Sequence, residues 1–264
     1  MNLEIRSKKA RSIRCPYPLI FIHGAAGGAW YFENFLEYFS KHGYDSYAIS
    51  LRAHGLSDGY EDLDLYGLAD YVEDVRSLVM QFNIKPILIG HSMGGAIVQK
   101  YMNTYPNDLF AAVLLSSAEA GGIDKDSHLG LFFSDAIKFL RKIRKDHPEK
   151  RITIDQLLNE TVFSNRFSEE ELREIKSKLT KESALVKKEL LDPYIDNYDK
   201  IKIPVCVIGS RNDHIVTMDK TIKTAQAFHV EPIMLDSLCH FLTIDPDWEK
   251  AAEAIHLFIS QIKK

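Results

Sequence analysis

Short apolar runs alternate along the chain with longer segments whose apolar positions recur at helical spacing. Runs rich in branched and aromatic side chains indicate β-strands, whereas the longer pattern indicates helices. Strands are predicted at residues 19–22, 44–49, 87–89, 112–115, 205–208 and 232–235, and helices at residues 29–41, 66–82, 94–104, 217–228 and 247–262. Several of these strands are apolar nearly throughout, as expected when helices cover both faces of a sheet. The pattern therefore predicts an α/β fold with a mostly parallel, doubly wound sheet.

Residues 121–195 interrupt this alternation. They contain no convincing strand, and they carry 15 Lys or Arg residues against 14 Asp or Glu residues. Several stretches have amphipathic helical spacing and begin with Ser, Thr or Asp, which are common at helix N-termini. An insertion between two strands of one sheet lies on a crossover connection. We therefore expect a helical cap over residues 121–195 and a core formed by residues 1–120 and 196–264.

Composition narrows the class of protein. The 264 residues suit one large domain, or one domain that carries an insertion. A formal net charge of -4 provides no general basic surface for nucleic acid, and no apolar run is long enough to predict a membrane span. The N-terminal residues lack the apolar stretch of a secretion signal. Three cysteines without a Cys-x-x-Cys pair favour a reduced, cytoplasmic setting over a disulfide framework.

Small residues surround one serine at the start of a predicted helix. Gly90, Ser92 and Gly94 fit the pattern Gly-x-Ser-x-Gly, in which a sharp strand-to-helix turn raises a serine hydroxyl above the sheet. Such a turn leaves room only for small residues two positions before and after the serine. An ordinary glycine-rich turn is the alternative interpretation. We predict that Ser92 is a nucleophile.

A serine nucleophile needs a base within hydrogen-bonding reach. Functional groups of an open parallel sheet gather beyond the carboxyl ends of its strands. The histidines that follow predicted strands are His23, His54, His91, His214 and His240. His91 is next to the serine and must point elsewhere, His214 adjoins an acid candidate, and the first two precede glycines in loops. His240 lies five residues beyond the end of the last predicted strand and is therefore the predicted base.

The base in turn needs a carboxylate that orients it. Asp213 follows the strand at 205–208 on a short turn and is the predicted acid. Asp236, at the end of the last predicted strand, is the main rival, and Glu119 is a second.

Acyl transfer also needs two N–H donors for the oxyanion of the tetrahedral intermediate. One is predicted from Met93, which follows the serine, and the other from Ala25 in the small-residue loop after the first predicted strand. Ala26 is the alternative to Ala25. No dinucleotide-binding fingerprint and no clustered metal-ligand spacing occur in the sequence, so no cofactor is expected.

Taken together, five motifs resemble the α/β-hydrolase family. They are HGAAGGAW at 23–30, RAHGLSDG at 52–59, GHSMGG at 90–95, GSRNDHIV at 209–216 and CHFLTIDP at 239–246. The resemblance implies a catalytic triad of Ser92, Asp213 and His240, an oxyanion hole formed by Ala25 and Met93, and a cap at 121–195. The family commonly opens with a longer hairpin of two strands. Because the N-terminus of this chain is short, that hairpin is expected to be short or partly absent.

These features predict a serine hydrolase that cleaves small to medium carboxylic esters through an acyl-enzyme. The resemblance also allows other reactions of the same triad, namely thioester hydrolysis, C–C bond hydrolysis, perhydrolysis and hydroxynitrile cleavage. A ligand-binding receptor with a vestigial site is a further alternative. The aromatic residues considered for an apolar pocket are Trp30, Phe132, Phe133, Phe163, Phe167 and Tyr194. The expected partner is a small ester substrate, and the sequence leaves the oligomeric state open.

Overall fold

The computed structural model describes residues 1–127, 129–131, 138, 141–142, 144–145, 159 and 161–262. Within these residues one sheet contains seven strands in the order β1-β3-β2-β4-β5-β6-β7. The strands are β1 (Ile5–Lys8), β2 (Leu19–Ile22), β3 (Ser46–Ile49), β4 (Ile87–His91), β5 (Ala111–Leu115), β6 (Val205–Ser210) and β7 (Ile233–Leu235). All neighbouring pairs are parallel except β1 with β3. The predicted mostly parallel sheet is thereby confirmed.

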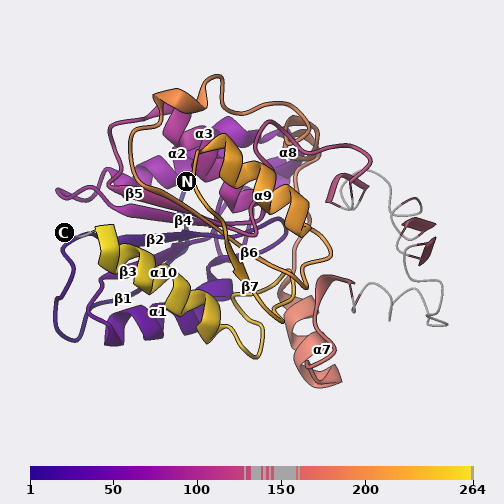
Figure 1. Ribbon diagram of the computed structural model, residues 1–264, viewed down its shortest axis with the longest axis horizontal. Coiled ribbons are helices and arrows are strands. Elements are labelled where there is room, and N and C mark those ends of the chain that lie inside the picture. The colour runs from indigo at the N-terminus through magenta and orange to yellow at the C-terminus, as the bar shows by residue number, and fades with distance from the viewer. Residues whose placement is uncertain are drawn as a thin grey trace.

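Helices cover both faces of the sheet (Figure 1). α1 (Glu33–Lys41) and α10 (Glu249–Ile262) lie on one face, and α2 (Leu68–Val79), α3 (Met93–Thr104) and α9 (Met218–Ala227) lie on the other. Every residue of β2, β4 and β5 is buried between these layers, which explains why these strands are apolar except for His91 at the end of β4. The described residues also form the short 3₁₀ helices η1 (Ala29–Phe32), η2 (Tyr60–Leu65) and η3 (Tyr198–Lys200).

The N-terminal strand β1 forms the edge of the sheet. It runs antiparallel to β3, with Ile5 opposite Ile49, and it is the single strand before β2 in residues 1–18. The sequence did not indicate this strand because its residues are mostly exposed and two of the four are charged. Lys8 forms an ion pair with Glu37, so a side-chain contact also links the edge strand to α1.

The described part of residues 121–195 contains α7 (Glu169–Lys178) and α8 (Ala184–Glu189). Ser168 caps α7 in a reciprocal arrangement with Glu171, and a serine at the start of a helix agrees with what the sequence suggested for this segment. Ser183 accepts a hydrogen bond from the N–H of Val186 and donates to the carbonyl of Tyr66, which fixes α8 against η2. The division into core and cap remains a prediction.

Two further expectations concern the setting of the chain. Among the described residues, no helix is long and apolar enough to cross a membrane. Cys15, Cys206 and Cys239 are buried and form no disulfides. Burial raises the pKa of the Cys206 thiol to about 12, so that thiol is protonated and unreactive at neutral pH. A cytoplasmic setting stays a prediction.

Candidate active site

Ser92 occupies the sharp turn between β4 and α3. Its backbone has φ 54° and ψ -118°, a region that a residue with a side chain rarely adopts. A Cβ on Gly90 would lie 2.3 Å from the carbonyl oxygen of Gly94, and one on Gly94 would lie 2.3 Å from that of Ile22. Both glycines are therefore required by close backbone contacts. The small residues in the sequence therefore reflect a strained strand-to-helix turn rather than an ordinary glycine-rich turn.

The structure brings Ser92, His240 and Asp213 together in one hydrogen-bonded chain. His240 Nε2 lies 3.0 Å from Ser92 Oγ, and His240 Nδ1 lies 2.9 Å from Asp213 Oδ2. The other oxygen of Asp213 accepts the N–H groups of Ile215 and Val216 at 2.8 and 2.9 Å. All three side chains are buried. This is the geometry of a serine, a base that can take its proton and a carboxylate that orients the base.

The hydrogen bonds of Asp213 keep its carboxylate ionised. Burial alone would raise the pKa of this group, but the charge and hydrogen bond of His240, together with the two backbone donors, outweigh it and lower the pKa below its ordinary value. An ionised carboxylate facing Nδ1 keeps the proton on that nitrogen. The opposite nitrogen, Nε2, is then free to accept the serine proton.

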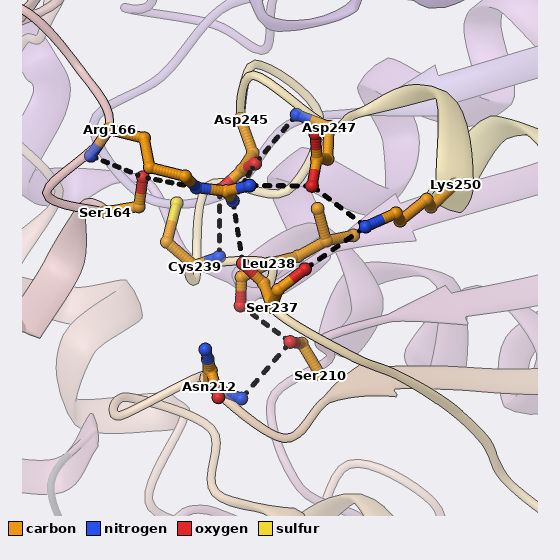
Figure 2. Close-up of polar contacts among 10 residues, drawn as sticks. All are labelled: Ser164, Arg166, Ser210, Asn212, Ser237, Leu238, Cys239, Asp245, Asp247 and Lys250. Atoms are coloured by element: carbon orange, nitrogen blue, oxygen red, sulfur yellow. Dashed lines mark hydrogen bonds and ion pairs between the residues drawn. The ribbon is translucent and has the colours of Figure 1, made fainter.

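The loop that carries His240 is tied to its surroundings by side chains from distant parts of the sequence. Figure 2 shows Arg166 lying against Asp245 and the carbonyl of Ser237, with donor–acceptor distances of 2.5 and 2.7 Å. Asp245 in turn accepts the N–H of Cys239 at 3.0 Å. On the β6 side, Ser210 donates to the carbonyl of Leu238 at 2.6 Å. The residues on either side of His240 are therefore held from two directions.

The rival acids lie elsewhere in the structure. Asp236 is exposed and pairs with Arg211 at 3.0 Å. Glu119 is buried, but its carboxylate accepts the N–H of Asp124 at 2.7 Å and pairs with Lys220 at 3.2 Å. Neither carboxylate bonds His240, so the geometry favours Asp213.

Two other histidines beside the turn are neutral and form hydrogen bonds with the neighbouring backbone. His91 donates from Nε2 to the carbonyl of His240 at 2.8 Å, and burial lowers its pKa to about 3. His23 accepts the N–H of Leu51 at Nε2, and its Nδ1 lies 2.7 Å from the carbonyl of Gly24. Burial lowers the pKa of His23 to about 3 as well, so each ring holds one proton at neutral pH.

The predicted oxyanion donors lie beside the serine. Met93 is the first residue of α3, where a backbone N–H has no partner within the helix. Ala25 lines the same cavity as Ser92. The N–H of Ala26, the alternative donor, bonds Glu182 at 3.1 Å and is therefore engaged. This contact favours Ala25 over Ala26.

A cavity of about 370 Å³ opens onto Ser92 and His240. Its lining is mainly apolar and includes Tyr31, Leu129, Val162, Phe163, Leu179, Ile215 and Phe241. Of the predicted pocket aromatics, Phe163 lines the cavity and stacks on Phe241 with ring centroids 4.8 Å apart. The neighbour of Trp30, Tyr31, is the lining residue in η1.

The other aromatic residues that were predicted for the pocket do not line the cavity or lie outside the described residues. Trp30 packs edge-on against Tyr31, outside the set that lines the cavity. Phe167 packs edge-on against Phe163, and buried Tyr194 donates a hydrogen bond to the carbonyl of Glu119. Phe132 and Phe133 lie outside the described residues.

Sequence reasoning missed Glu182, which lines the cavity although it comes from a highly charged stretch. Its side chain is 5% exposed. Charged residues at helical spacing normally indicate a solvated face, so no local pattern distinguishes this carboxylate from its neighbours. For metal binding, no group of three or more His, Cys, Asp or Glu residues in the described part of the chain has a suitable arrangement.

Comparisons with known proteins agree with the fold. A family model described as the alpha/beta hydrolase fold matches residues 17–247. The AB hydrolase superfamily protein YisY of Bacillus subtilis is 28% identical over 217 residues, which cover 76% of this chain and 76% of that protein. Two further curated relatives are matched over only 38% and 37% of their own length.

Solved structures show the same architecture. An esterase from Exiguobacterium antarcticum superposes with a TM-score of 0.77 at 16% identity, over 99% of this chain and 96% of that one. A bromoperoxidase from Bacillus anthracis superposes with a TM-score of 0.74 at 19% identity, over 98% and 95% of the two chains. Because these two proteins are named for different activities on one fold, the fold alone does not identify the reaction, which depends on the residues of the site.

Proposed function

Since the chain belongs to the α/β-hydrolase fold family, we propose that it is a serine hydrolase that cleaves small to medium carboxylic esters through an acyl-enzyme. The proposal rests on the contacts of 3.0 Å between Ser92 and His240 and 2.9 Å between His240 and Asp213, at the wall of a largely apolar cavity. A nucleophile, a base and an orienting acid in this arrangement suit acyl transfer.

In the first half of the reaction, Ser92 Oγ attacks the ester carbonyl while His240 Nε2 takes the serine proton. Asp213 stabilises the imidazolium that forms. The N–H groups of Met93 and Ala25 stabilise the oxyanion of the tetrahedral intermediate. When the intermediate collapses, His240 returns the proton to the leaving alcohol, and the acyl group remains on Ser92.

In the second half, water takes the place of the alcohol. His240 accepts a proton from the water, whose oxygen attacks the acyl carbon. Collapse of the second intermediate releases the carboxylic acid and returns the proton to Ser92. The cavity volume of about 370 Å³ lies at the small end of the range of ligand pockets, which supports a small to medium acyl group.

Two measurements test the proposal with the intact chain. A fluorophosphonate probe should label Ser92 with loss of fluoride, and a series of p-nitrophenyl esters from acetate to dodecanoate should show a maximum of kcat/KM among the shorter chains. A receptor with a vestigial site would bind such esters without turnover and would label poorly. Absence of both labelling and hydrolysis at neutral pH would reject the proposed function.

A further inference from the structure

The backbone of Ala26 is held on both sides by a segment that lies more than 150 residues away in the sequence. The N–H of Thr180 donates to the carbonyl of Ala26 at 2.9 Å, and the N–H of Ala26 donates to Glu182 Oε2 at 3.1 Å. Ala26 has a left-handed backbone with φ 60°, which a residue with a side chain adopts only when its surroundings hold it there. The loop that contains Ala25 is therefore shaped by residues 180–182.

Glu182 is surrounded by donors. Its Oε2 also lies 3.1 Å from His54 Nε2, and its Oε1 accepts the hydroxyl of Tyr71 and the N–H of Ser183, each at 2.8 Å. Four donors around two oxygens require an acceptor-only group, and an ionised carboxylate is the side chain that provides it. Burial would raise the pKa of Glu182, but these partners outweigh burial and lower the pKa below its ordinary value.

His54 completes the arrangement as a cation. Both of its ring nitrogens face oxygens, because Nδ1 lies 2.9 Å from the carbonyl of Arg52 and Nε2 faces Glu182. Burial disfavours the charged ring, yet the hydrogen bond and charge of Glu182 prevail and raise the pKa of His54. The result is a buried imidazolium–carboxylate pair directly behind the Ala25–Ala26 loop. Removal of one partner from such a pair is costly, since the other is left buried and unpaired.

We propose that Glu182 is a positioning residue for the oxyanion hole: it holds the N–H of Ala26 so that the preceding N–H, that of Ala25, remains available to the oxyanion. This inference rests on the proposed function, and it adds a residue from outside the sheet to the machinery of that site. Glu182 need not touch the reacting atoms to act in this way. Its effect should appear wherever a negative oxygen develops beside Ser92 and should be small in the binding of neutral substrate.

The variant Glu182→Gln tests the inference, because an amide has nearly the same shape but presents an NH₂ group to two of the four donors. Loss of one oxyanion donor typically lowers kcat by about 10² to 10³, so a misplaced donor should lower it by at least about tenfold. We expect that loss in kcat for p-nitrophenyl acetate with KM changed less than about twofold. The affinity for phenylboronic acid, which forms a tetrahedral anionic adduct on Ser92, should fall by the same factor as kcat.

Glu189→Gln is the matched control. Glu189 lies in the same segment and also accepts a backbone N–H of the core, that of Leu68 at 2.6 Å, but it does not line the cavity. This variant should retain both kcat and boronate affinity. If Glu189→Gln lowers them as much as Glu182→Gln does, the effect is general loosening of the segment and the inference is wrong.

Tyr71→Phe provides a second test that does not depend on the folding of Glu182→Gln. It removes one donor to Glu182 and places no new polar group in the interior, so we expect a smaller loss of both kcat and boronate affinity, about two- to fivefold, with KM unchanged. Values within the error of wild type in Tyr71→Phe, or a loss of kcat without a parallel loss of boronate affinity in either variant, would overturn the inference. If the wild type neither hydrolyses esters nor binds the boronate, the proposed function itself fails.

Discussion

The two sides of the cavity are built differently. On the sheet side, Ser92, Asp213 and His240 follow β4, β6 and β7, and the backbone packs so closely around Gly90 and Gly94 that neither position has room for a side chain. On the other side, Val162, Phe163 and Leu179 come from residues 121–195. That segment is linked to the core mainly by side-chain contacts, among them those of Arg166, Glu182 and Glu189, and by a backbone hydrogen bond from Thr180 to Ala26.

This difference separates two tasks. Chemistry needs reacting groups fixed within a fraction of an ångström, and packed backbone supplies that precision. Substrate selection depends on the volume and shape of the opposite wall, which a few side chains determine. Substitutions on the sheet side should therefore affect the rate of reaction with every substrate, whereas substitutions on the other side should affect which substrate is preferred.

Ser92→Ala should produce the largest effect. The variant keeps a small residue at the turn, so the fold should remain intact, while removal of a triad member typically lowers kcat by about 10⁴ to 10⁶. Initial rates with p-nitrophenyl acetate, together with the thermal midpoint, measure both expectations. Activity within tenfold of wild type would show that another residue is the nucleophile.

Asp213→Asn should come next, with kcat lower by about 10⁴, because an amide in place of the carboxylate favours the wrong tautomer of His240. Asp236→Asn and Glu119→Gln serve as controls, since these carboxylates bond Arg211 and Lys220 rather than His240. Near-normal turnover in Asp213→Asn, with a large loss of kcat in one of the controls, would show that the carboxylate changed in that control is the acid.

The same contrast explains what could be predicted from the sequence. The strands, the serine turn and the candidate triad were recognisable because each leaves a local pattern: an apolar run, small residues at fixed spacing, or a polar residue just after a strand. Position after a strand did not decide among Asp213, Asp236 and Glu119; the contacts with His240 favour the first. Strand β1 was not predicted, because an exposed edge strand needs no apolar run.

The parts that could not be predicted depend on long-range packing. Glu182 is one of several charged residues in its stretch, and only contacts with His54, Tyr71 and Ala26 distinguish it. Likewise, Tyr31 rather than Trp30 lines the cavity, which depends on how η1 is turned against the sheet. Neither outcome leaves a periodic signal in the residues themselves.

Arg166→Met tests whether the link from residues 121–195 to the loop of His240 is needed for stability. Arg166 is about a third exposed, but its partner Asp245 is fully buried and would lose one charged donor while keeping two backbone donors. We expect unfolding to become easier by about 1–3 kcal/mol, measured by urea denaturation. Arg211→Met breaks an exposed ion pair with Asp236 and should change the same quantity by less than about 0.5 kcal/mol. Equal effects of the two variants would contradict the importance of the buried partner.

Phe163→Ala should have the smallest effect on rate and the clearest effect on preference. The ring lines the cavity and stacks on Phe241, so its removal enlarges the wall opposite Ser92 without touching the triad. One methylene in an apolar pocket is worth about 1–3 kcal/mol, and since the surroundings can partly fill the space, we expect the ratio of kcat/KM for octanoate over butyrate esters to rise about three- to tenfold. Phe167→Ala is the matched control, because Phe167 packs against Phe163 without lining the cavity. An unchanged chain-length profile in Phe163→Ala, with labelling of Ser92 by the fluorophosphonate also unchanged, would mean that the acyl group lies elsewhere and that residues 121–195 do not select it.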